Sequence, residues 1–232
     1  MIENSKQTSH GLRSLKRLMR WLAVAVVSTS LVGCNWVVLL GYLIGGPPSI
    51  EPEFDAETGN SLTDRGVTVL VLCHAEKELK FDHDSIDYQV AKYTTFRLHE
   101  HHVKVVDPDR VRAWLDEHDD WDRPEEVGEA FGVDYVISID LIKFSIFEEN
   151  SSHLYRGRAE AMVSVIQMDE DHEDGEKIFS KDVLSKYPLL SARDTHEVSQ
   201  SNFKRQYLSR LSEEIGRKFY EHYVADDIMD GT

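Results

Sequence analysis

A long β-strand is predicted by the run Val133-Asp134-Tyr135-Val136-Ile137-Ser138-Ile139-Asp140-Leu141-Ile142-Lys143-Phe144-Ser145-Ile146-Phe147. Apolar and polar residues alternate along it, which is typical of a strand with one buried face. The alternation changes parity partway, because Leu141 is followed directly by Ile142 as the next apolar position. One extra residue near Leu141 would restore a single buried face, so we expect a β-bulge there.

Two more strands and a helix are predicted downstream. Residues 155–168 alternate charged residues with glycine and alanine, and Asp174-Gly175 marks a hairpin turn into a strand at 177–183. From Glu197 to Tyr223 we expect one helix. Its apolar residues recur at every fourth position, which predicts a buried stripe: Phe203, Tyr207, Leu211, Ile215 and Phe219.

Upstream, strands and helices are predicted to alternate. The β-branched run at 67–73 is typical of a strand buried on both faces. We expect, in order, a helix at 85–99, a strand at 103–106, a helix at 108–118 capped by Asp107, and a helix at 124–131 ended by Gly132. The order is β-α-β-α-α-β-β-β-α. It predicts an α/β protein (α+β), with one mixed sheet and helices packed on it, as a single domain at 67–232.

The N-terminal region predicts export and lipidation. Basic residues precede an uncharged apolar run, which ends in Leu31-Val32-Gly33-Cys34. This motif resembles the signal of bacterial lipoproteins, which are cut just before a lipid-bearing cysteine. We therefore expect a signal peptide at 1–33 and lipid on Cys34. Asn35 stands where an Asp retains such proteins at the inner membrane, so the resemblance implies an outer-membrane lipoprotein facing the periplasm.

An uncleaved anchor is the alternative, because no charged residue occurs between Trp21 and Gly46. After cleavage, the apolar run at 36–44 is too short to cross a bilayer as a helix. It is free to contact either lipid or the protein itself. Because 45–66 is rich in Gly, Pro, Ser and acids, we expect residues 34–66 to be the lipidated cysteine, the apolar segment and a flexible tether.

Charge limits the partners of the chain. Removing residues 1–33 takes away five basic side chains and one acidic one, so the formal charge moves from −16 to −20. Such a surface repels phosphate backbones, and we expect no nucleic-acid partner. With Cys34 lipidated, Cys73 has no disulfide partner and is expected to be a small buried apolar residue.

Gly132-Val133-Asp134-Tyr135-Val136-Ile137 and the acid-Gly-Glu turn Asp174-Gly175-Glu176 resemble segments of periplasmic lipoproteins. The likeness is to the α/β domains of the curli-secretion lipoprotein and of the Tol translocation protein's amino-terminal domain. Together with the lipobox, the Gly-Gly-Pro-Pro segment and Tyr155-Arg156-Gly157-Arg158, the chain also looks like a wider group of bacterial envelope lipoproteins. This resemblance implies an envelope α/β domain and supplies no catalytic residues.

No residue cluster predicts a cofactor or metal site. His99-Glu100-His101-His102 fits no zinc spacing, and 169–176 fails the register of a calcium loop. Cys73 and His74 are adjacent on a strand, so they point to opposite faces and form no dyad. Asp140 with Lys143, or Arg156 and Arg158 with Glu160, are expected to form cross-strand ion pairs.

These observations predict a non-enzymatic envelope lipoprotein. Its partners would be the membrane, through lipid on Cys34, and another envelope protein, for which its domain acts as an assembly or scaffolding module. Two alternatives stay open: a small-ligand-binding domain, and an enzyme with a site around His74, His99 and the acidic loops. A deep polar pocket at the carboxyl ends of the strands would favour these alternatives. An exposed apolar patch or sheet edge would favour the module.

Overall fold

The computed structural model describes residues 41, 43, 49–118 and 120–223. The chain divides into two units, Met1–Pro48 and Ser49–Thr232. The predicted signal peptide, Cys34 and most of the apolar segment at 36–44 lie outside the described residues. The second unit contains, in order, β1 (Ser49–Ile50), α2 (Glu53–Thr58), β2 (Val69–Ala75), α3 (Lys77–Asp82), α4 (Ile86–Glu100), α5 (Pro108–Glu117), α6 (Pro124–Phe131), β3 (Tyr135–Phe147), β4 (Leu154–Met168), β5 (Gly175–Tyr187), β6 (Arg193–Asp194), α7 (Gln200–Gly216) and β7 (His222–Tyr223).

One mixed sheet organises this unit, in the order β2-β3-β4-β5. β2 and β3 are parallel, whereas β3, β4 and β5 pair in antiparallel fashion. The short β6 adds to the start of β4. The predicted α+β class, with one mixed sheet and helices packed on it, is confirmed.

The bulge predicted near Leu141 is also confirmed. The register between β3 and β4 shifts between Leu141 and Lys143, so Ile139 and Phe144 both face the same core although their parity differs. A second shift lies between Val165 and Ile166, in the pairing of β4 with β5.

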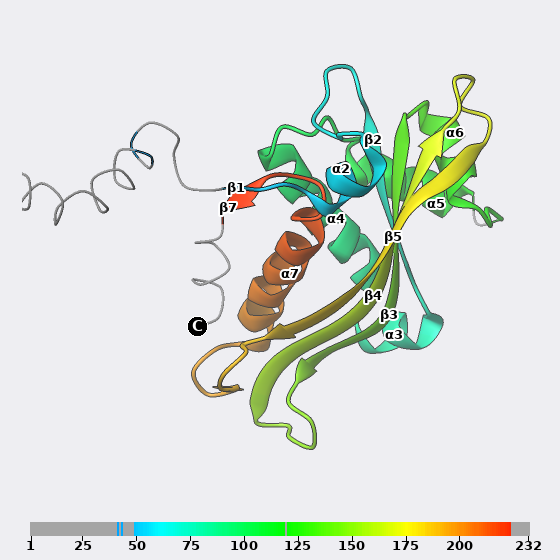
Figure 1. Ribbon diagram of the computed structural model, residues 1–232. Coiled ribbons are helices and arrows are strands. Elements are labelled where there is room, and N and C mark those ends of the chain that lie inside the picture. Colours follow the sequence, from blue (N-terminus) through cyan, green and yellow to red (C-terminus); the bar gives the residue numbers. More distant parts are fainter. Residues whose placement is uncertain (1–40, 42, 44–48, 119, 224–232) are drawn as a thin grey trace, which may run out of the picture. The chain divides into compact units, whose positions relative to one another are not determined.

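Helices cover the two faces of the sheet unequally (Figure 1). α4 and α7 pack on one face and form the larger core with β2–β5. The predicted stripe is fully buried there: Phe203 to Ile215 lie on α7, and Phe219 follows the end of the helix. On the other face, α5 and α6 cover only one end of the sheet, where Leu70, Val136 and Ile166 contact Val111 and Val127 in a smaller core.

The predicted helix ends at Asp107 and Gly132 are confirmed. The side chain of Asp107 accepts a hydrogen bond of 2.9 Å from the backbone N–H of Asp109, and Pro108 occupies the first helical position, where it needs no N–H partner. Gly132 ends α6 with φ of +58°, a left-handed conformation that favours glycine.

Two predicted elements were too long. The strand expected at 103–106 forms only one parallel bridge, between Val105 and Val69, because Asp107 and Pro108 begin α5 at once. The helix expected at 197–223 ends at Gly216. Tyr220 folds back against that glycine, where a Cβ would lie 2.7 Å from the ring, and the chain then enters β7.

The predicted boundary at residue 67 was wrong, because residues 49–66 belong to the folded unit. Phe54 of α2 is fully buried and stacks edge-on against Tyr135 and Phe179, and Leu62 is also fully buried. β1 pairs with β7, so that Ser49 lies opposite Tyr223 and Ile50 opposite His222. The interpretation of this part of the chain as a flexible tether fails because its few apolar side chains complete the core.

Candidate functional site

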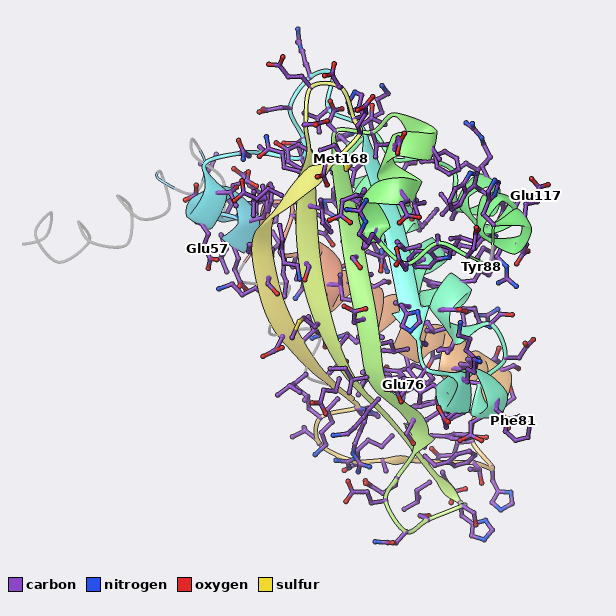
Figure 2. The ribbon with its side chains drawn as sticks, turned by 90° about the vertical axis from the view of Figure 1, so that its right-hand side faces the viewer. Glu57, Glu76, Phe81, Tyr88, Glu117 and Met168 are labelled. Atoms are coloured by element: carbon purple, nitrogen blue, oxygen red, sulfur yellow. The ribbon has the colours of Figure 1, made fainter. Side chains whose placement is uncertain are left out.

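One face of β3, β4 and β5 is left uncovered by helices over part of its length. In Figure 2, α7 lies behind the sheet and no helix crosses the lower front of these three strands. We call this surface the open face and define it by six outward-facing residues: Asp140, Ile142, Glu160, Met162, Asp182 and Leu184.

Strand register sorts the open face into rows that run across the strands. Met162 on β4 lies opposite Asp140 on one side and Asp182 on the other. Both carboxylates are exposed, and among the described residues neither makes an ion pair or a side-chain hydrogen bond. The row therefore places one apolar side chain between two carboxylates that lack a cation.

The rows on either side differ in chemistry. Ser138, Ser164 and Ser180 form the row nearer α6, and the last two hydroxyls lie 3.2 Å apart. On the other side, Glu160 lies opposite Leu184 and pairs with Lys143 at 2.6 Å. The exposed fractions of Ile142, Met162 and Leu184 are 46, 38 and 79%. Met162 and Leu184 thus lie uncovered on adjacent rows, and Ile142, which the register skips between Leu141 and Lys143, is also exposed.

The ion pairs predicted on these strands were only partly right. Lys143 pairs with Glu160 rather than with Asp140. Arg156 and Arg158 instead pair with Glu148, at the end of β3, and the Arg156 contact is 2.7 Å long. Because Lys143 pairs with Glu160, Asp140 has no cation among the described residues. Asp182, which the sequence did not single out, lies in the same row only because of the β4–β5 register.

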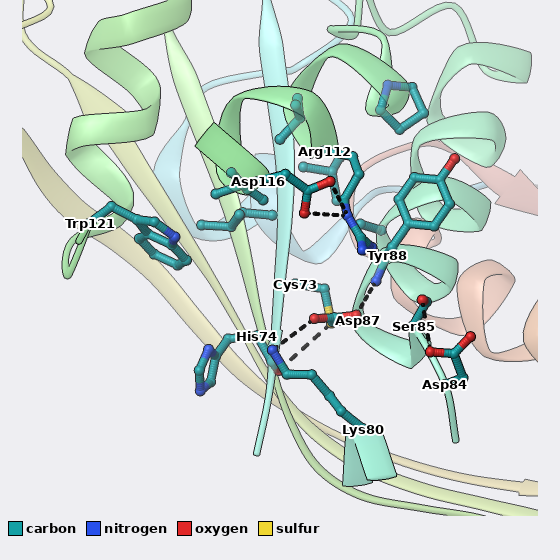
Figure 3. Close-up of a pocket in the computed structure, with 16 residues that line it drawn as sticks. Cys73, His74, Lys80, Asp84, Ser85, Asp87, Tyr88, Arg112, Asp116 and Trp121 are labelled. Atoms are coloured by element: carbon teal, nitrogen blue, oxygen red, sulfur yellow. Dashed lines mark hydrogen bonds and ion pairs between the residues drawn. The ribbon is translucent and has the colours of Figure 1, made fainter. Parts of the chain in front are cut away.

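A cavity of about 380 Å³ lies at the carboxyl end of β2 (Figure 3). Its walls come from β2, from the start of α4, from α5 and from Trp121. The position matches the place where ligands bind in open α/β sheets. A neighbouring groove of about 700 Å³ shares His74, Lys80 and Trp121 with it and extends over Asp140 and Ser164.

Charged groups in the cavity are already paired with one another. The Lys80 ammonium lies 2.9 Å from the Asp87 carboxylate. Arg112 donates from Nε to both carboxylate oxygens of Asp116, at 2.9 and 3.1 Å. Figure 3 shows both pairs on the wall, between Tyr88 and Trp121. The cavity is polar, but its cations have acidic partners within the protein.

Cys73 and His74 lie as the sequence predicted. Cys73 is buried, and its burial raises the pKa of the thiol well above the ordinary value. His74 is exposed on the opposite face of β2, so the two side chains form no dyad. A buried thiol with a raised pKa stays protonated and is a poor nucleophile.

The histidine cluster does not converge on one point. His101 stacks on Tyr220 with ring centroids 3.5 Å apart, and burial lowers the pKa of its imidazole. His99 and His102 are exposed, and His99 lines a separate groove beside Phe96 and Val105. Within the described ranges, no three His, Cys, Asp or Glu side chains are arranged to hold a metal ion. The acidic run predicted as a loop forms the exposed turn between β4 and β5.

Comparisons with known proteins find similar solved structures of low sequence identity. No protein-family model matches the chain, and no curated protein matches it in sequence. Among solved structures, the chain is similar to the lipoprotein GNA1162 of Neisseria meningitidis, with 13% identity and a TM-score of 0.40 over 64% of this chain and 97% of that one. It is also similar to the PelC dodecamer of Paraburkholderia phytofirmans, with 8% identity and a TM-score of 0.40 over 75 and 96%.

A third likeness is to the C-terminal domain of LpoB from Salmonella enterica, with 11% identity and a TM-score of 0.32 over 57% of this chain and 97% of that one. At these identities the likenesses concern the fold alone. Among the helices of the described part of the chain, none has the length and apolar character needed to cross a bilayer.

Proposed function

We propose that this chain is an exported lipoprotein, held at a membrane by lipid on Cys34, whose α+β domain binds another envelope protein as a non-enzymatic assembly module. The leader and its Leu31-Val32-Gly33-Cys34 motif support the anchor. The open face supports the binding role.

The exposed apolar side chains of the open face carry this proposal. A sheet face that only meets water is expected to bear polar residues. Here Ile142, Met162 and Leu184 are exposed on neighbouring positions, within a polar surround of serines and carboxylates. Apolar side chains grouped on one face and rimmed by polar groups are typical of a protein interface.

The chemistry of the cavity supports a binding role over catalysis. A general base or nucleophile needs a free, suitably poised group within reach of a substrate. Lys80 and Arg112 each have a carboxylate partner, and the Cys73 thiol is buried with a raised pKa. The Lys80–Asp87 pair joins α3 to α4, and the Arg112–Asp116 pair lies within α5.

A small-ligand-binding domain is the second candidate, and the cavity of about 380 Å³ favours it. Its volume falls in the range of small-molecule pockets, and Trp121 and Tyr88 provide aromatic walls. The paired cations weigh against a small-ligand role, because an anionic ligand would have to displace Asp87 from Lys80 or Asp116 from Arg112.

Site-specific photocrosslinking in intact cells tests the proposed function. A photoreactive residue replaces Leu184 on the open face in the full-length protein. The matched control places it at Leu190, in the loop after β5, which has the same exposed fraction of 79%. We expect an adduct with an envelope protein from position 184 and a much weaker one from position 190. Adducts of equal strength, or none from position 184, would refute the proposal.

A further inference from the structure

We propose that the open face binds a basic amphipathic helix of the partner protein, lying across the strands with an apolar residue on Met162 and cations on Asp140 and Asp182. This inference rests on the proposed function, because it names the kind of partner that the open face fits. Three observations carry it: the spacing of the row, its unpaired charge and the chemistry of the neighbouring rows.

Spacing favours a helix over an extended strand. Asp140, Met162 and Asp182 occupy successive strands, and neighbouring strands lie about 4.8 Å apart, so the backbones at Asp140 and Asp182 are separated by roughly 9.6 Å. Helix residues seven apart lie about 10.5 Å apart along the axis and on the same side. In a strand, residues on one face lie about 6.8 or 13.6 Å apart, and neither spacing matches the row.

The same helix would place an apolar side chain between its two cations. Residues three or four positions after the first cation lie on the same side of a helix, midway to the second. That position falls over Met162. A helix with its side chains is about 10 Å wide, so it also reaches the next row, where Ile142 and Leu184 are exposed.

Charge complementarity points to cations on the partner. Asp140 and Asp182 have no cation among the described residues, whereas Glu160 in the next row is neutralised by Lys143. Farther along the sheet Lys186 lies opposite Arg158, whose guanidinium is paired with Glu148 and Glu149. A basic helix is therefore attracted to the row of Met162, where the two carboxylates have no cation among the described residues.

The serine row leaves room for this helix. Ser138, Ser164 and Ser180 are small; the first two are buried, and of this row only Ser180 is exposed. Larger side chains there would hold a helix away from the sheet. The outward rows thus present, in order, the three serines, then Met162 between two carboxylates, then the exposed Leu184 beside the Lys143–Glu160 ion pair.

The experiment uses the full-length protein with the photoreactive residue at position 184. It compares two double variants, each of which removes two negative charges. The first is Asp140→Asn with Asp182→Asn, on the open face. The control is Asp171→Asn with Glu173→Gln, which removes the same charge from the exposed turn between β4 and β5. We expect the first pair to lower the adduct yield about fivefold, as the loss of two exposed ion pairs would. The control pair should leave the yield unchanged.

Two further readouts make the outcome decisive. Mass spectrometry of the adduct should identify a partner segment with Lys or Arg seven residues apart and an apolar residue between them. The melting temperature of the Asn variant should equal that of the parent, because both carboxylates are exposed and unpaired. A lowered melting temperature would reveal a loss of yield caused by misfolding. In that case the test is repeated with the single variant Asp140→Lys, after its folding has been checked, and the adduct yield should again fall.

The opposite outcomes overturn the inference. An acidic or uncharged partner segment, a peptide of this chain itself, a lipid adduct, or an unchanged yield in the Asn variant would each do so. An unchanged yield with a genuine protein adduct would refute only the partner's chemistry. The absence of any protein adduct from position 184 would refute the proposed function as well.

Discussion

Tyr207 lies flat against the backbone of Gly157, so closely that a Cβ at position 157 would meet its ring at 2.3 Å. The other side of the Tyr207 ring stacks on Phe144, at a centroid distance of 5.5 Å. The ring is fully buried between β4 and β3, and burial raises the pKa of its hydroxyl. Position 157 must therefore be glycine for α7 to approach the sheet.

Gly157→Ala should lower the free energy of unfolding by about 1 to 3 kcal/mol, because the added methyl group overpacks the core. Denaturant unfolding of the fragment Ser49–Thr232 measures this. In a double-mutant cycle with Tyr207→Leu, the cost of the alanine should shrink, since the smaller side chain gives it room. Costs that simply add would show that the two residues do not constrain each other.

Phe54→Ala should lower the free energy of unfolding of the same fragment by about 3 to 5 kcal/mol, the usual cost of truncating a buried aromatic residue. Phe54 is fully buried against Tyr135, Phe179 and Phe219. The exposed Phe81 provides the matched control, and its change to Ala should cost less than about 0.5 kcal/mol. Equal, small losses of unfolding free energy at both positions would support the interpretation of this segment as a flexible tether.

Leu211→Ala should cost about 2 to 5 kcal/mol, because Leu211 is fully buried in the stripe of α7. Leu190→Ala, at an exposed leucine, is the control and should cost under about 0.5 kcal/mol. Chemical denaturation gives both values. A loss below about 0.5 kcal/mol at Leu211 would mean that α7 is held loosely and is available to a partner.

Stability should fall as the pH drops below about 6.5, the ordinary pKa of histidine. Burial lowers the pKa of His101 in the folded protein, so the unfolded chain binds the proton more tightly. Stability from this group is present above the unfolded pKa and is lost as the pH falls toward the lower, folded value. His101→Phe keeps a ring on Tyr220 but cannot titrate. Melting curves between pH 7 and pH 5 should therefore show a smaller acid loss in this variant, and equal losses would contradict the assignment.

Cys34→Ser should release the mature protein from the membrane, because lipid on this cysteine is the proposed anchor. Fractionation of cells that express the full-length chain measures the release. Intact mass measurement of the wild-type protein should give an N-terminus at Cys34 that carries lipid. A wild-type chain that still begins at Met1 would instead support the uncleaved anchor.

The sequence predicted those elements whose signal is local. The parity change at Leu141 located the bulge, and the stripe of α7 identified the buried face, because each pattern lies within a single element. Phe54 was missed as a core residue, since one apolar residue in a polar segment gives no periodic signal. The strand at 103–106 was overestimated because β propensity does not reveal how many partner residues are available, and only Val69 pairs with it.

The candidate site depends on register, which the sequence did not determine. Met162 lies between Asp140 and Asp182 only because the bulge near Leu141, the shift after Val165 and the turn between β4 and β5 align three strands. A slip of one residue would turn these side chains to the other face. Asp140 alone was noted from the sequence, and it was assigned to Lys143, which pairs with Glu160 instead.

The pairing of β1 with β7 brings Ser49 opposite Tyr223, so the described domain begins and ends at one place. A short linker could close the chain there, and new ends could be opened in the exposed turn between β4 and β5 without cutting a strand. The domain is therefore suited to circular permutation, and to insertion as a module into a surface loop of another protein.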